Sequence, residues 1–181
     1  MIELLAIPFF MGNIAKADID NSLRVVMVGD MLMHERVIES GAREDGGYNF
    51  DHLFTNVRDT IEAAELALVN QETILGGTEL RLSGYPCFNS PYELGDSLVN
   101  AGFDVVLHAT NHALDKGKKG IINCLAYWEE AYPEIAVLGI QDSQEEQDKI
   151  YVCEKNGIRI AILNYTYGTN GIPLPEDMPY A

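Results

Sequence analysis

Residues 103–117 read FDVVLHATNHALDKG, a short apolar run that changes abruptly into a polar loop. The run at 103–107 is rich in valine and has the length of a strand rather than of a helix. The loop at 108–117 carries imidazole, amide and carboxylate side chains directly after it. Because ligands collect at the carboxyl ends of strands in parallel α/β sheets, this stretch predicts such a sheet with a functional loop at its edge.

Apolar runs on either side of this stretch predict further strands with helices between them. The strand-like runs cover residues 23–29, 66–69 and 135–138. The first of them is β-branched and is typical of a buried parallel strand. Apolar residues at helical spacing, and a proline suited to a first helical turn, predict helices over residues 49–64, 91–100 and 120–131. This alternation predicts an α/β fold with helices on both faces of the sheet.

A β-hairpin is predicted after the last of these strands. Strand-like runs at 149–154 and 158–165 flank Lys155, Asn156 and Gly157. Asparagine and glycine both tolerate positive φ, which a two-residue hairpin turn requires.

The composition describes one acidic domain. The chain has 181 residues, 47% of them hydrophobic, with 28 acidic and 12 basic residues and a net charge of −16. A protein with this much negative charge repels nucleic acid and anionic lipid. No nucleic-acid partner is therefore expected. It suits a protein that attracts cations, although solubility alone explains the charge equally well. Three widely spaced cysteines make neither a disulfide framework nor a cysteine zinc site.

Polar side chains follow three of the predicted strands. They are Asp30 after the first, Asn70 and Glu72 after the second, and Asn111, His112 and Asp115 after the third. Oxygen ligands of this kind suit Mg²⁺ or Mn²⁺, and added histidines favour Mn, Fe or Zn. Two such ions would activate a water and stabilise charge on a phosphoryl or acyl centre.

Each of these residues also has a purely structural interpretation. Asp30 could cap the following turn, and Glu72 could be a solvated loop acid. Asn111 could satisfy a turn, His112 could be a hydrogen-bonded core histidine, and Asp115 could cap a helix. The metal hypothesis depends on all of them lying at strand ends of one sheet.

These motifs resemble the three leading motifs of the bacterial poly-γ-glutamate capsule-synthesis (CapA-like) family. The matching stretches are residues 29–32 (GDML), 70–72 (NQE) and 111–117 (NHALDKG), with 85–91 and 165–171 similar to the family's connecting loops. The resemblance implies an α/β fold similar to the layered sandwich of calcineurin-like metallophosphoesterases, of which residues 23–181 would form the N-terminal part.

The resemblance also implies roles for individual residues. Asp30, Glu72 and Asn111 would be metal ligands in a centre that holds two divalent ions, Mn, Fe, Zn or Mg. His112 would be the general acid or contact the substrate oxyanion, and Asp115 would hold His112 in place.

The chain departs from the phosphoesterase pattern in two ways. That pattern has a histidine two residues after the first aspartate, whereas here the nearest one is His34, expected on the following helix. No histidine follows His112, although the family has further histidine motifs downstream. A fragment, a chain completed by a second chain and a degenerate product are the three explanations left open.

The N-terminus is interpreted as a separate segment. Residues 2–11 are apolar and Ala15-Lys16-Ala17 has the small-x-small form of a secretory cleavage site, but Glu3 stands where a positive charge is expected. Residues 1–22 are therefore predicted to be a leader or the remnant of a signal peptide or anchor. The alternative is a packed or flexible apolar leader.

The resemblance implies an extracytoplasmic, metal-dependent hydrolase or transferase that acts on poly-γ-glutamate or another anionic polymer. The bond would be a γ-glutamyl amide or a phosphoester. One alternative is a non-catalytic accessory or scaffold subunit of a membrane polymer synthetase, and another is a generic metallophosphoesterase. An acidic enzyme on a polyanion needs the metal or nearby bases to offset repulsion, and the nearby bases are Arg81, Lys116, Lys118 and Lys119.

Overall fold

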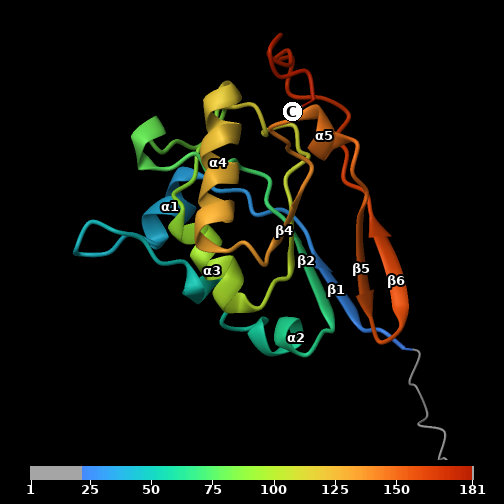
Figure 1. Cartoon of the computed structure of the whole chain (residues 1–181). Coiled ribbons are helices and arrows are strands. Elements are labelled where there is room, and N and C mark those ends of the chain that lie inside the picture. The colour runs from blue at the N-terminus through green and yellow to red at the C-terminus, as the bar shows by residue number, and fades with distance from the viewer. Residues whose placement is uncertain (1–21, 181) are drawn as a thin grey trace, which may run out of the picture.

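The computed structural model describes residues 22–180, which form a parallel sheet, a hairpin and flanking helices (Figure 1). The parallel sheet has the order β1-β2-β3-β4, and β5 pairs with β6 in an antiparallel hairpin. The strands are β1 (Val25–Val28), β2 (Leu66–Asn70), β3 (Val105–Leu107), β4 (Ala136–Leu138), β5 (Tyr151–Lys155) and β6 (Ile158–Ile162). The α-helices are α1 (Glu35–Ser40), α2 (Arg58–Glu62), α3 (Glu93–Ala101), α4 (Gly117–Ala131) and α5 (Gln144–Gln147). The predicted α/β class is confirmed.

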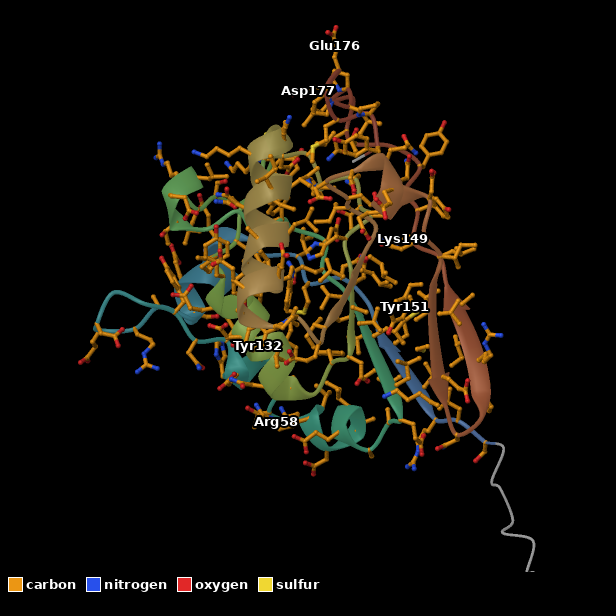
Figure 2. The ribbon with its side chains drawn as sticks, viewed as in Figure 1. Arg58, Tyr132, Lys149, Tyr151, Glu176 and Asp177 are labelled. Atoms are coloured by element: carbon orange, nitrogen blue, oxygen red, sulfur yellow. The ribbon has the colours of Figure 1, made fainter. Side chains whose placement is uncertain are left out.

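The sheet is covered by helices on one face and by the hairpin on the other, so the prediction of helices on both faces is wrong. Side chains alternate along the central strands. Ala67, Val69 and Val106 enter the core that α1 to α4 share. Leu66, Leu68, Val105 and Leu107 pack instead against Tyr151, Cys153, Ile160 and Ile162 of the hairpin. Figure 2 shows Tyr151 between the hairpin and the sheet.

The hairpin can replace a helical layer because one face of it is apolar. Burial alternates along both β5 and β6, so each strand turns every second side chain toward the sheet. Asn156 and Gly157 form its turn with φ values of 52° and 75°. Positive φ at both positions matches the twist of the two strands, which confirms the predicted hairpin.

Strand β1 is less buried than its sequence predicts. Val25 is 48% exposed and Met27 is 67% exposed, although Val26 and Val28 pack on the helical side. The reason is position, because β1 is an edge strand and the hairpin packs on β2 and β3.

The helix predicted over residues 49–64 is replaced by a 3₁₀ turn at Asp51–Leu53 and the short helix α2. Asn49 Oδ1 accepts a hydrogen bond from the Asp51 N–H at 3.1 Å, and Ser97 Oγ accepts one from the Phe50 N–H at 3.0 Å. These side-chain acceptors offer the backbone an alternative to helical bonds. The apolar spacing was real, because Phe50, Phe54 and Ile61 are all buried.

One sequence prediction, the leader or anchor at residues 1–22, concerns a membrane. Among residues 22–180, no helix combines the length and the apolar character that crossing a bilayer needs. The leader predicted at 1–22 falls almost wholly outside the described residues.

A buried histidine links the helical layer to the loop after β2. Trp128 Nε1 donates to His108 Nε2 at 3.3 Å, and Cys124 Sγ lies 3.6 Å from the same nitrogen. The His108 ring also bonds to the backbone of Gln71. Burial lowers the pKa of His108 to about 3, so the imidazole is held neutral in the core.

The pKa of His108 predicts a loss of stability in acid. Below about pH 6.5 the unfolded chain binds a proton at His108 that the folded chain does not. The free energy of unfolding should therefore fall with decreasing pH, by up to about 1.4 kcal/mol per unit from this group. Urea unfolding of the wild type and His108→Gln from pH 7 to 4 measures this slope.

The His108→Gln variant should lose this share of the slope. Trp128→Phe, which removes the indole donor but keeps the histidine, should be less stable and retain it. An unchanged slope in His108→Gln would show that another group causes the acid sensitivity.

Candidate functional site

The backbone ladder of the parallel sheet continues past the carboxyl ends of its strands. The Met31 N–H donates to the carbonyl of Asn70 at 2.8 Å, and the Gln71 N–H donates to the carbonyl of Leu107 at 2.8 Å. The His108 N–H donates to Leu138 at 2.7 Å. These bonds hold the three polar loops side by side at one edge.

Two carboxylates, from the loops that follow β1 and β2, lie near each other at this edge. Burial, followed by the charge of Asp30, raises the pKa of Glu72, while the charges of His112 and His34 lower it. Asn70 Nδ2 donates to Asp30 Oδ1 at 2.5 Å. Asp30 and Glu72, 42 positions apart by their numbers, are thus close enough to interact.

His112 is held in a fixed orientation by a buried carboxylate. Its Nδ1 lies 2.7 Å from Asp115 Oδ2, and the Asp115 side chain is 1% exposed. The Phe88 N–H donates to the same oxygen at 2.6 Å, and the Phe88 ring meets the imidazole edge-on at 4.6 Å. The Asp115 carboxylate accepts a hydrogen bond from the Nδ1–H of His112, which leaves Nε2 available for chemistry. Asp115 does not cap α4, because Lys116 precedes its first residue.

Asn111 lies on the same loop but bonds elsewhere. Its Nδ2 donates to Asn170 Oδ1 at 3.1 Å, and within residues 22–180 it has no direct hydrogen bond to Asp30 or Glu72. The loop itself is attached to the site, because Thr110 Oγ1 donates to the carbonyl of Glu72 at 2.7 Å.

His34 lies nearer the site than its place in the sequence indicated. It immediately precedes α1, so the expectation of a histidine on that helix misses by one position. Its ring meets Phe88 edge-on at 5.1 Å, on the residue that also packs against His112.

Sequence reasoning did not single out Asn170 and Phe88. Asn170 belongs to the loop after the hairpin, and nothing local shows that packing of the hairpin returns this loop to Asn111. Phe88 precedes an Asn-Ser-Pro stretch that is buried and hydrogen-bonded through Asn89 and Ser90. These turn-forming residues were the sequence feature that could have drawn attention to Phe88.

The predicted ligands Asp30, Glu72 and Asn111 form only part of a coordination shell for one hard divalent cation. Across residues 22–180, no three His, Cys, Asp or Glu side chains gather into a metal cluster. Asp30 and Glu72 nevertheless bring an exposed and a partly buried carboxylate together, where a cation would relieve their repulsion. Amide oxygens complete shells of this kind around Mg²⁺ or Mn²⁺. A second ion would need ligands beyond these.

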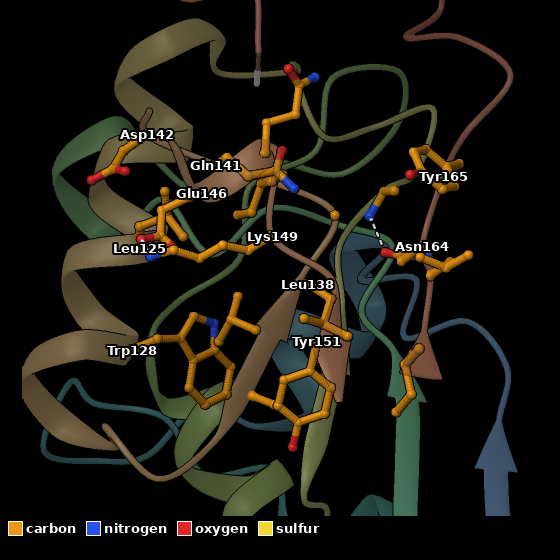
Figure 3. A pocket seen from close by; sticks show the side chains of 18 of the residues that line it. Leu125, Trp128, Leu138, Gln141, Asp142, Glu146, Lys149, Tyr151, Asn164 and Tyr165 are labelled. Carbon is orange, nitrogen blue, oxygen red and sulfur yellow. Dashed lines mark hydrogen bonds and ion pairs between the residues drawn. The ribbon is translucent and has the colours of Figure 1, made fainter. Parts of the chain in front are cut away.

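One hollow lies beside this edge and does not include the carboxylates. It measures about 1140 Å³ and lies between α4, β4 and the hairpin, with Trp128, Leu138 and Tyr151 on its walls (Figure 3). A smaller hollow of about 320 Å³ is bounded by Asn111 and residues 166–171. Of these two hollows in residues 22–180, the smaller one adjoins a predicted site residue, Asn111.

The buried Asp115 predicts a measurable contribution to stability. Asp115→Ala leaves the Phe88 N–H and the His112 ring without their acceptor, which should cost about 1–3 kcal/mol. Urea unfolding at pH 7 measures the loss. Asp177→Ala, which removes an exposed aspartate paired with Lys118, should leave the midpoint unchanged. Equal midpoints for the two variants would contradict the role of Asp115 in holding the loop.

Comparison with known proteins identifies the family. A search of the curated proteins found no match. The model of a family described as bacterial capsule synthesis protein PGA_cap matches residues 24–179, which include all three strand-end motifs. The chain therefore belongs to the bacterial capsule synthesis protein family PGA_cap.

Proposed function

We propose that this chain carries a metal-dependent site for hydrolysis or transfer at a γ-glutamyl amide or a phosphoester of an anionic capsule polymer. The observation that supports this best is the pair of carboxylates, Asp30 and Glu72, lying near each other beside the fixed imidazole of His112. Membership of a capsule synthesis family supports the substrate class.

The residues divide the chemistry between them. Asp30 and Glu72 would hold a divalent cation through their carboxylates, and Asn111 would add an amide oxygen. A cation bound there polarises an acyl or phosphoryl oxygen and lowers the pKa of a bound water. Asp115 holds the Nδ1–H of His112, so in the doubly protonated imidazolium form the proton on Nε2 would be the one given to the leaving atom.

Charge favours a cation-bridged approach of the polymer. The protein carries a net charge of −16, so a polyanion meets long-range repulsion. Of the bases near the Asn-His motif, Lys118 already pairs with Asp177. A bound metal would therefore be the main attraction for an anionic substrate. Because the proposed substrate is a capsule polymer, we propose that the reaction takes place outside the cytoplasm.

A second candidate function is an accessory subunit of a membrane polymer synthetase. The incomplete donor set of residues 22–180 favours it. A generic phosphoesterase has less support, because His34 stands four residues after Asp30 instead of two. Protein that takes up no metal at any concentration and still binds a synthetase would support the accessory role.

Metal binding is the first prediction of the proposed function. The wild type should bind Mn²⁺ in a calorimetric titration, and Asp30→Ala and Asn111→Ala should each weaken binding at least about tenfold. Asp45→Ala, in an exposed loop where Asp45 pairs with Arg43, is the matched control and should bind as the wild type does. Wild-type protein without Mn²⁺ binding would rule out the metal-dependent site.

The role of His112 is tested separately. His112→Asn should lower the rate of hydrolysis by about 10²–10⁴-fold and leave Mn²⁺ binding intact, because the imidazole moves a proton and holds no ion. A chromogenic γ-glutamyl anilide and an aryl phosphate, each assayed with Mn²⁺, show which bond is cleaved. A variant as active as the wild type would exclude His112 as the acid.

A further inference from the structure

We infer that Asn170 is a positioning residue that orients the Asn111 amide, so that the oxygen of Asn111 and not its nitrogen is free for a cation. The inference rests on the proposed function, because it assigns a task within the same site. It brings the loop after the hairpin, residues 164–171, into the candidate centre.

The contacts of Asn170 fix the direction of its neighbour's amide. Asn111 Nδ2 donates to Asn170 Oδ1 at 3.1 Å. Asn170 Nδ2 lies 3.3 Å from His112 Nδ1 but does not donate to it, because the Nδ1–H is held by Asp115. With its nitrogen engaged, Asn111 presents Oδ1 on the opposite side of the amide. Within residues 22–180 no donor bonds to that oxygen. An amide oxygen binds hard cations, whereas the NH₂ group has only donors to offer.

The backbone at Asn170 shows that the side chain matters. Asn170 has φ of 53° and Gly171 has φ of 78°, in a turn where the Ile172 N–H donates to the Thr169 carbonyl at 2.9 Å. Glycine occupies such a position without strain, and asparagine is one of the few other residues that tolerate it. An asparagine that accepts a hydrogen bond from Asn111 out of this turn supplies a contact that glycine cannot.

The loop is anchored at its other end as well. The Ala109 N–H donates to Asn164 Oδ1 at 2.8 Å, on the stretch directly after β3, and Figure 3 shows Asn164 with this bond. Gly139 leaves room for it, because a Cβ there would lie 2.1 Å from Asn164 Oδ1. Two asparagines thus attach the loop to the strand-end motif at two points.

The hairpin turn of the same chain offers a matched control. Asn156 also has positive φ, at 52°, and is also followed by a positive-φ glycine. Its side chain donates to the Ser22 carbonyl at 3.2 Å, away from the site. Asn170→Gly and Asn156→Gly therefore make the same chemical change on equivalent backbone.

Manganese titration of the full chain tests the inference. Asn170→Gly should weaken Mn²⁺ binding by about 10- to 100-fold, the usual effect of removing a group that orients a ligand. Asn156→Gly should bind as the wild type does. Asn170→Asp keeps the oxygen acceptor for Asn111 and should bind at least as tightly as the wild type.

A metal-free measurement accompanies the titration. The side-chain amide resonances of Asn111 in the nitrogen-15 NMR spectrum should shift in Asn170→Gly and stay in place in Asn156→Gly. Wild-type Mn²⁺ binding that Asn170→Gly leaves intact overturns this inference and spares the proposed function. Absence of Mn²⁺ binding in the wild type overturns both.

Discussion

The parallel hydrogen-bond ladder is the constraint on which the rest of this structure depends. Parallel strands must all end at one edge, and here the ladder runs one bond further, through Met31, Gln71 and His108, into the loops. Residues separated by tens of positions along the chain thereby lie in neighbouring loops, where their side chains can interact. The polar groups need no contacts of their own to assemble, because backbone bonds align them before any ligand arrives.

This alignment sets like charges together. Asp30 and Glu72 would repel each other less if either loop were displaced, yet the backbone holds them. Burial of Glu72, followed by the charge of Asp30, raises the pKa of Glu72. Folded proteins keep such unfavourable groupings mainly where function requires them. The proximity of these two carboxylates is in this sense better support for a cation site than the acidity of the whole chain, because net charge alone also serves solubility.

Local patterns predicted what depends on neighbours in sequence. Runs of valine and leucine gave the strands, and Asn156 with Gly157 gave the hairpin turn. The broken helix near Asn49 was missed because side-chain acceptors outweighed apolar spacing. The exposure of β1 and the part played by Asn170 could not be read at all, since both follow from where the hairpin packs. That packing pairs residues up to about a hundred positions apart, and no local signal encodes it.

The β5–β6 hairpin contributes both to the stability of the fold and to the position of a site residue. Its apolar face closes the second core against β2 and β3, and the same strand β6 leads directly into the loop that reaches Asn111. Loss of that packing would therefore remove Asn170 from the site directly, whereas Asp30 and Glu72 are also held by the hydrogen-bond ladder of the sheet. Two independent layers thus support the site: the ladder positions the charged groups, and the hairpin positions the amide beside them. Changes in residues 164–171 can therefore alter the position of the Asn111 amide without moving Asp30 or Glu72.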